Sequence, residues 1–324
     1  MRVQRTGRAA AAAVATAVVA GATLAGGPTQ ATAAQAGAVV VNDVLTISGT
    51  NAADQISVDF TSPGPVVVDF GGSNGTHGFA AGSFHSAVVD LRSGDDQFRT
   101  ISGGALVDVP ITLTAGNGND TATTGAGRDL LVGGNGEDVI NGGVGTDLEV
   151  LGNGDDTAAW NPGDGNDTIV GGLGRDTLAF NGSNGDELMS LSANGGSAVF
   201  LRNLGTIRMD LAGVERLDLA TFGGVDTVTI GDLSGTEVTT AEIDLAATTG
   251  AADAKDDTVQ VFGTDQSDQV DVTASGAAVE VTGLAAQTSV TGGDPTDRLL
   301  IDTLGGDDRV TVSDSARALL TIQP

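Results

Sequence analysis

The stretch 133-GGNGEDVINGGVGTDLEVLGNGDDTAA-159 decides the fold. It repeats one unit of nine residues three times, as GGNGEDVIN, GGVGTDLEV and LGNGDDTAA. Each copy has Gly at positions 2 and 4, Asp at position 6 and a short strand-like end. Repetition at a short fixed period is typical of a solenoid, in which each unit packs on its neighbours.

The unit continues on both sides of this stretch. Seven copies begin at residues 115, 124, 133, 142, 151, 162 and 171, and the last ends at residue 179. Two residues, Trp160 and Asn161, are inserted before the sixth copy, whose third position is an additional aspartate, Asp164. Position 6 is aspartate in every copy, at Asp120, Asp129, Asp138, Asp147, Asp156, Asp167 and Asp176. One acidic side chain per copy indicates one task per copy.

The composition limits what the chain can be. It has 324 residues, 50 of them glycine, no cysteine, 3% aromatic residues and a formal charge of −28. We expect thin layers of strand built from small and β-branched residues, and no core built around large rings. The charge argues against nucleic acid as a partner and favours cations. Without disulfides, a bound metal is one means of holding a secreted domain together.

Residues 1–33 are predicted to be an export signal. Arg2, Arg5 and Arg8 give a positive start, an alanine-rich apolar run follows, and Ala31-Thr32-Ala33 forms an A-x-A cleavage site. A membrane anchor is the alternative, but the run is short and weakly hydrophobic. No later segment is expected to span a membrane. We therefore expect cleavage near Ala33 and a secreted, extracellular protein.

The rest of the chain is predicted to be all-β. Polar turns that end in Asp precede short alternating strands, with irregular spacing, at Asp54, Asp226, Asp257, Asp268 and Asp308. We divide the chain into irregular β-rich coils over 34–114, the regular array over 115–186 and a β-rich region over 187–324. One solenoid through all three regions is the alternative.

The array suggests how its turns stack. Glycines permit a tight turn of six residues, and three residues remain for a strand. Two units make one coil, so each unit lies on the unit 18 residues later. One edge then carries Asp120, Asp138, Asp156 and Asp176, and the other carries Asp129, Asp147 and Asp167. Stacked carboxylates repel, and calcium, which takes 6–8 oxygen ligands including carbonyls, would bind between them.

The pattern G-G-x-G-x-D-x-U-x, with U a large apolar residue, resembles the hemolysin-type (RTX) calcium-binding nonapeptide. The resemblance implies a parallel β-roll that binds calcium between turns. The ligands are the carbonyls of positions 2 and 4 and the carboxylate of position 6 in one unit. The carbonyls of positions 1 and 3 and the carboxylate of position 6 come from the unit two places later.

Carried over to this chain, the resemblance implies about five calcium ions. The first site combines Gly116, Gly118 and Asp120 with Gly133, Asn135 and Asp138; the second, Gly125, Gly127 and Asp129 with Gly142, Val144 and Asp147; the third, Gly134, Gly136 and Asp138 with Leu151, Asn153 and Asp156; the fourth, Gly143, Gly145 and Asp147 with Pro162, Asp164 and Asp167; the fifth, Gly152, Gly154 and Asp156 with Gly171, Leu173 and Asp176. The last two sites need Trp160 and Asn161 to bulge out of the coil.

The apolar position of the repeat is predicted to face inward. Leu131, Ile140, Ile169 and Leu178 follow the pattern. Ala122, Glu149 and Ala158 depart from it, and Glu149, between Leu148 and Val150, leaves its own inward orientation open.

Other motifs carry weaker signals. Residues 71–75 match G-x-S-x-G near Asp69 and His77, but a nucleophile elbow needs a helix after its turn, and none is predicted. His77 and His85 are expected to be surface residues rather than a metal pair. Asp95-Asp96 and Asp307-Asp308 are expected to be solvated turns, with further calcium sites as the alternative.

Three functions are compatible with these patterns. The first is a secreted, non-enzymatic calcium-binding protein whose array folds on calcium. The second is an extracellular adhesin or matrix component, with calcium as a structural staple and a cell-surface or matrix polysaccharide or protein as partner. The third is an enzyme with its catalytic part in 37–114 or 187–324, which the motifs disfavour.

Overall fold

A computed structural model describes residues 35–61, 64–72, 75–101 and 108–324 of the chain. The predicted export signal over 1–33 and the serine of the G-x-S-x-G motif, Ser73, lie outside the described residues. Contacts between residues divide the chain into two compact units. The first holds the residues up to Ala159 and also Gly163–Asp176; the second holds Trp160–Pro162 and Thr177–Pro324.

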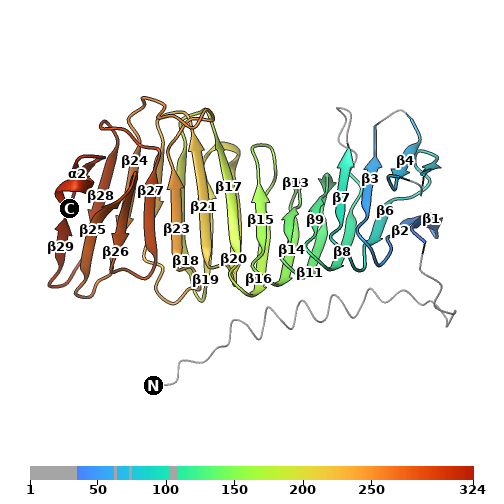
Figure 1. Ribbon diagram of the computed structural model, residues 1–324, viewed down its shortest axis with the longest axis horizontal. Coiled ribbons are helices and arrows are strands. Elements are labelled where there is room, and N and C mark those ends of the chain that lie inside the picture. The colour runs from blue at the N-terminus through green and yellow to red at the C-terminus, as the bar shows by residue number, and fades with distance from the viewer. Residues whose placement is uncertain (1–34, 62–63, 73–74, 102–107) are drawn as a thin grey trace, which may run out of the picture. The chain divides into compact units, whose positions relative to one another are not determined.

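The first unit is a stack of coils in which the chain alternates between two sheets (Figure 1). The first sheet has the order β1 (Gly37–Val41), β2 (Val44–Ser48), β6 (Ser86–Asp90), β8 (Ile111–Asn117), β11 (Leu130–Asn135), β14 (Leu148–Asn153), β16 (Thr168–Leu173). The second has the order β5 (Thr76–Phe79), β4 (Val66–Asp69), β3 (Gln55–Asp59), β7 (Gln97–Ile101), β9 (Thr121–Thr123), β12 (Val139–Asn141), β15 (Thr157–Trp160). A short pair, β10 (Ala126–Gly127) and β13 (Val144–Gly145), joins two turns.

The second unit repeats the two-sheet plan with longer strands. One sheet has the order β20 (Ile207–Ala212), β19 (Ser197–Arg202), β18 (Leu188–Asn194), β22 (Thr227–Ile230), β24 (Thr258–Phe262), β28 (Arg298–Asp302), β30 (Thr321–Gln323). The other has the order β17 (Thr177–Ser183), β21 (Arg216–Phe222), β23 (Thr240–Asp244), β27 (Gln287–Thr291), β26 (Ala278–Thr282), β25 (Gln269–Ser275), β29 (Arg309–Val312). Two short helices, η1 (Leu204–Thr206) and α2 (Asp314–Arg317), complete it.

Most strand pairs are parallel, and antiparallel hairpins occur where the chain turns back within one sheet. In the array the parallel register is 18 residues, as in the pairing of Leu130 with Leu148 and of Val139 with Thr157. After the insertion the register becomes 20 residues, with Leu148 opposite Thr168. The predicted all-β, parallel β-roll is confirmed, and so is the stacking of each unit on the second unit after it.

The core forms from columns of side chains that the register brings together. Leu113, Leu131, Glu149 and Ile169 lie in one column, and Ala122, Ile140 and Ala158 lie in the facing one. All are buried, so Glu149 does point inward. Burying each Leu or Ile side chain in such a column contributes about 1.5–3 kcal/mol. Leu178 is likewise buried in the second unit.

Two expectations about aromatic residues are wrong. Trp160 does not bulge out, because its side chain is 1% exposed and strand β15 runs through it. In the second unit its ring stacks on Phe180 with centroids 4.1 Å apart, and Phe180 packs on Phe200 at 4.5 Å. Large rings therefore do build one small part of the core. The low aromatic content conceals this cluster because the few rings available are gathered at one place.

Candidate metal centre

The aspartates of the array form two ladders. On the first edge, the backbone N–H of Asp120 donates to Oδ1 of Asp138 at 2.8 Å, and Asp138 donates to Asp156 in the same way. Asp156 N–H donates to Asp176 Oδ1 at 3.1 Å. On the second edge, the equivalent bonds run from Asp129 to Asp147 at 2.7 Å and from Asp147 to Asp167 at 2.9 Å. Oδ1 therefore has a structural task, which is to join each turn to the preceding one.

The second carboxylate oxygen has no such partner. Among the described residues, Oδ2 is buried without a hydrogen-bond partner at Asp120, Asp129, Asp138, Asp147 and Asp156. A buried polar atom left unsatisfied costs about 1–3 kcal/mol, and more when it is charged. Native structures rarely leave such atoms without a ligand. Five of them at equivalent places fit a repeated site for a cation.

The electrostatics of the ladders point the same way. Burial raises the pKa of Asp138 to about 7; the N–H bond from Asp120 opposes this, and the neighbouring carboxylates of Asp156 and Asp120 add to it. Burial also raises the pKa of Asp147 and of Asp167. A divalent cation would reverse these shifts, since opposite charge favours the ionised carboxylate.

The glycines bring the turns within reach of each other. At Gly134 and Gly136 φ is 129° and 130°, a region that L side chains rarely adopt. A Cβ on Gly136 would lie 2.0 Å from the carbonyl oxygen of Gly118 in the turn below. Only glycine fits here, and the close stacking places the carbonyls of one turn beside the next turn.

One glycine outlines the space for an ion. A Cβ on Gly133 would lie 2.4 Å from the carbonyl oxygen of Leu151 and 2.6 Å from Oδ2 of Asp138. These two oxygens, both predicted ligands of the third site, therefore face the same small space. Within the described ranges, no three His, Cys, Asp or Glu side chains cluster at metal-binding distance. A site made of two carboxylates and several carbonyls fits a hard cation such as calcium.

This geometry agrees with a comparison against known families. Residues 114–149 and 163–187 match the RTX calcium-binding nonapeptide repeat, in four copies. The repeats of this family bind calcium. The matched segments omit residues 150–162, although the ladder bonds include Asp156 from that interval. A comparison with curated proteins found no match to the chain.

The RTX turns of the first edge are uniform. Gly116, Gly134, Gly152 and Gly172 have φ between 118° and 130°, and register places each on the next. A side-chain amide ladder accompanies them: Asn153 Nδ2 donates to Asn135 Oδ1 at 2.7 Å, and Asn135 to Asn117 at 2.8 Å. The structure thus brings together the residues predicted for the first, third and fifth sites.

The second edge is less regular. Val144 N–H donates to the Gly125 carbonyl, but in the next turn Gly165, one repeat position later, donates to Gly143. Asp164 therefore lies one position out of the predicted register, and its Oδ2 accepts from Asn141 Nδ2 at 3.0 Å.

Two further features distinguish the second edge. Pro162, predicted to share the fourth site with residues of the first unit, belongs to the second unit. Glu149 Oε1 accepts from Gly142 N–H at 2.7 Å, and burial raises the pKa of Glu149 well above its usual value. Both features separate these turns from the uniform first edge.

The ladders extend to residues that the sequence analysis left out of the array. In the first unit, Asp54 N–H donates to Asp96 Oδ1, and Asp96 to Asp120, at 2.7 and 2.8 Å. In the second unit, Glu187 donates to Asp226, and Asp226 to Asp257, both at 2.8 Å. The recurring Asp-ended turn at Asp54, Asp226 and Asp257 was the signal. Its irregular spacing concealed the stacking.

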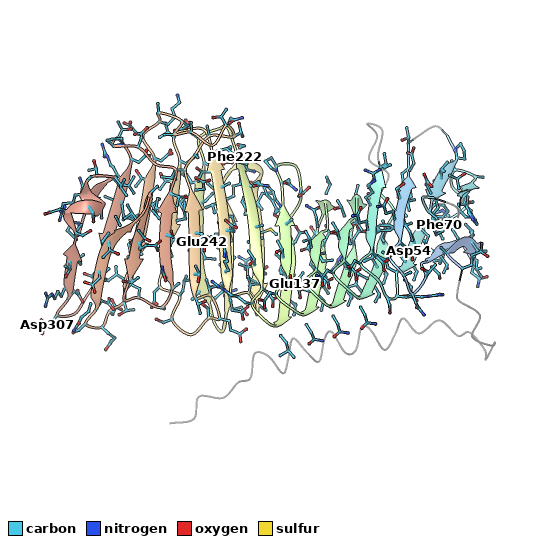
Figure 2. The ribbon with its side chains drawn as sticks, viewed as in Figure 1. Asp54, Phe70, Glu137, Phe222, Glu242 and Asp307 are labelled. Carbon is cyan, nitrogen blue, oxygen red and sulfur yellow. The ribbon has the colours of Figure 1, made fainter. Side chains whose placement is uncertain are left out.

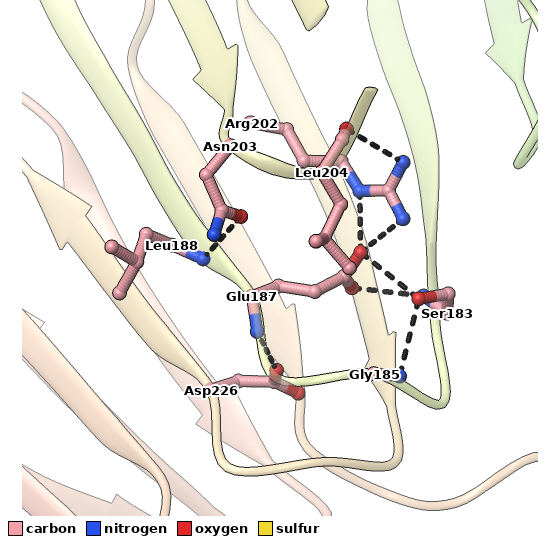
Figure 3. A network of polar contacts seen from close by, with 8 residues as sticks. All are labelled: Ser183, Gly185, Glu187, Leu188, Arg202, Asn203, Leu204 and Asp226. Atoms are coloured by element: carbon pink, nitrogen blue, oxygen red, sulfur yellow. Dashed lines mark hydrogen bonds and ion pairs between the residues drawn. The ribbon is translucent and has the colours of Figure 1, made fainter. Parts of the chain in front are cut away.

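In the second unit a resident cation satisfies one ladder carboxylate (Figure 3). The buried guanidinium of Arg202 forms an ion pair with Glu187 and donates to the Leu204 carbonyl at 3.2 Å. It also lies 5.3 Å from the centre of the Trp160 ring. Ser183 N–H donates to Glu187 Oε2 at 2.8 Å. This turn has its own positive charge at the carboxylate.

The remaining motifs lie apart from the ladders. The described residues beside Ser73 form antiparallel strands, β4 and β5, rather than the strand and helix of a nucleophile elbow. His77 is in β5, and its ring packs edge-on against Phe70. The expectation of solvated aspartates is wrong for Asp96, which is 0% exposed.

Proposed function

We propose that the chain is a secreted protein whose RTX array binds about five calcium ions between stacked turns and folds when they bind. The observation that supports this most directly is the series of buried Oδ2 atoms, which lack partners within the described part of the chain at Asp120, Asp138 and Asp156. Without a cation these carboxylates are costly to bury; with calcium they become ligands. Calcium binding and the stacking of the turns would then be one event.

The proposed location follows from the sequence and the family. The chain begins with a predicted export signal, and the RTX repeat family is typically secreted. In the described residues no helix is long and apolar enough to cross a membrane. Extracellular calcium sites commonly have dissociation constants of about 10⁻⁴–10⁻³ M. With such affinity the array would stay open in the cell and close outside.

Far-UV circular dichroism during a calcium titration tests the proposal. The protein is expressed with its own signal, collected from the medium, and its N-terminus is determined. A cooperative, calcium-specific gain of β signal, absent with magnesium, is expected. A β-rich spectrum in chelator that calcium leaves unchanged would exclude folding on calcium. An intact residue 1 on protein recovered from the medium would contradict the cleaved signal.

A second candidate function, an extracellular adhesin or matrix component, is favoured by one surface feature. A pocket of about 390 Å³ lies against the second sheet of the first unit. Its lining is mostly polar and includes Gln55, Ser57, Asp69, Gln97, Arg99 and Thr121. Such side chains suit the hydroxyl groups of a polysaccharide. Retention on polysaccharide should be lost in chelator and weakened by Arg99→Ala, but not by Arg128→Ala in the array.

The proposed role is non-enzymatic. The support is the character of the array, in which every repeated carboxylate has a structural bond and a proposed metal bond. A panel of hydrolase substrates tests this, and turnover that Ser73→Ala abolishes would overturn it.

A further inference from the structure

A turn outside the matched repeats stacks on the first RTX turn of the array. The turn Leu91–Asp96 lies under the turn Ala115–Asp120, and three ladder bonds join them. Asp96 N–H donates to Asp120 Oδ1 at 2.8 Å, and Asn119 N–H donates to Asp95 Oδ1 at 2.9 Å. Asn117 Nδ2 donates to Ser93 Oγ at 3.2 Å. The same three positions form ladders within the array, so Leu91–Asp96 occupies the place of a repeat.

The backbone of this turn also follows the repeat. Arg92 and Gly94 have φ of 80° and 128°, so both lie in the left-handed region, as do Gly134 and Gly136. The carbonyl oxygen of Gly94 would lie 1.8 Å from a Cβ on Gly118. Arginine rarely adopts such a conformation, and the stacked turn holds it there. The family pattern requires glycine at this position, which explains why the match begins only at residue 114.

The carboxylate of Asp96 has the same unfilled requirement as those of the array. Asp96 is 0% exposed and its Oδ1 accepts from Asp54 N–H at 2.7 Å. Its Oδ2, like that of Asp120, is buried without a partner among the residues that the structure describes.

The turn below Asp96 provides a contrast. There Thr50 N–H, at repeat position 2, donates to Asp54 Oδ2 at 2.5 Å. Thr264 does the same for Asp268 in the second unit, at 2.7 Å. In these turns position 2 is not left-handed, its N–H faces the carboxylate, and the second oxygen is satisfied. Where position 2 is left-handed, as at Arg92, that bond is not made and the oxygen is left for a ligand.

We propose that the turns Leu91–Asp96 and Ala115–Asp120 bind one additional calcium ion. The ligands would be the carboxylates of Asp96 and Asp120 and carbonyls of the two turns, at the positions that the array uses. The inference rests on the proposed calcium binding of the array and adds a site before its first repeat. The positive charge of Arg92, which lies 3.9 Å from Asp90, makes this site weaker than those beside glycine.

Counting bound calcium on the secreted protein tests the site. Equilibrium dialysis followed by atomic absorption is carried out on the wild type, Asp96→Asn, Asp54→Asn and Asp138→Asn. Asparagine keeps the Oδ1 acceptor, so the bond from Asp54 to residue 96 survives. Asp96→Asn should bind one ion fewer than the wild type, and Asp54→Asn, the matched control in the same stack, should bind as many as the wild type.

The outcomes separate this inference from the proposed function. If Asp138→Asn loses ions while Asp96→Asn loses none, the additional site is wrong and the array stands. If the wild type binds no calcium, the proposed function itself fails.

A second variant covers the case in which Asp96→Asn does not fold. Arg92→Gly introduces the residue that the array has at this position and removes a positive charge. The affinity of the weakest ion should rise several-fold, and an unchanged calcium isotherm would overturn the site.

Discussion

The backbone N–H of Asp120 donates to Oδ1 of Asp138 at 2.8 Å, while Oδ2 of Asp138 is buried with no partner in the described residues. The two oxygens of one side chain thus have different tasks. Oδ1 joins two turns of the stack, and Oδ2 is left for a cation. Asparagine can replace the first task but not the second, because its nitrogen is a donor.

Asp138→Asn should therefore separate folding from calcium binding. It should lower the number of bound ions by about two, because Asp138 serves two predicted sites. In chelator it should make the fold more stable, because a buried charge is removed. Chemical unfolding with and without calcium measures both effects. Glu137→Gln, at the exposed neighbour labelled in Figure 2, is the control and should change neither. Full calcium binding by Asp138→Asn would refute the assignment.

Gly136→Ala should prevent the close stacking of turns. The new Cβ would lie 2.0 Å from the Gly118 carbonyl oxygen, so the backbone must move. We expect a loss of more than about 3 kcal/mol in the free energy of unfolding. Gly82→Ala is the control, since φ is 72° there and a new Cβ would meet no described atom within 4 Å. It should cost about 1–2 kcal/mol from conformation alone. Equal costs in thermal unfolding would show that stacking is not limiting.

The calcium-free protein should become less stable as the pH rises from 5 to 7.5. Burial raises the pKa of Asp138 and Asp226 to about 7, so the folded state binds more protons than the unfolded state above about pH 4. Stability gained by protonation is lost as the pH passes the folded pKa. Thermal unfolding in chelator measures this. With calcium present the dependence should weaken or reverse, because calcium competes with the protons. A rise in calcium-free stability over the same range would contradict the burial of these carboxylates.

Arg202→Gln should destabilise the second unit strongly. It leaves Glu187 buried without its partner cation, and breaking such a pair costs about 3–5 kcal/mol. Arg208→Gln is the control, because Arg208 and Asp210 form an exposed pair whose loss costs about 0–1 kcal/mol. Trp160, the one tryptophan of the chain, lies 5.3 Å from Arg202 and reports the change by its fluorescence. Equal stability of the two variants would mean that the buried pair contributes nothing.

The sequence predicts most of the array because period and geometry are linked. A nine-residue repeat with two copies per coil places Asp120, Asp138 and Asp156 in one line, and the structure has them there. The inward apolar positions follow from the same period. Stacking distance follows from glycine, since nothing larger fits at Gly134 or Gly136.

The features that were missed depend on contacts without a fixed period. Asp96 lies 24 residues before Asp120, and its turn has Arg92 in place of glycine. Glu187 meets Arg202 because the antiparallel pair β18 and β19 brings residues 15 apart together. Trp160 points inward because the longer coil provides room for its ring beside Phe180. A search by motif cannot find these, since each depends on how long the intervening loop is.

The equality of successive turns has a consequence for how such a chain can change. Gly134 meets Gly116, and Gly152 meets Gly134, in nearly the same way: a Cβ would lie 2.1 Å from the carbonyl below in one case and 2.2 Å in the other. Excision of residues 133–150 would join two surfaces that already match, and duplication of the same segment would insert one more. Gain or loss of whole coils would alter the capacity for cations in steps without requiring any new interface. Copy number, rather than substitution at single residues, would then be the easiest property of this array for unequal recombination to alter.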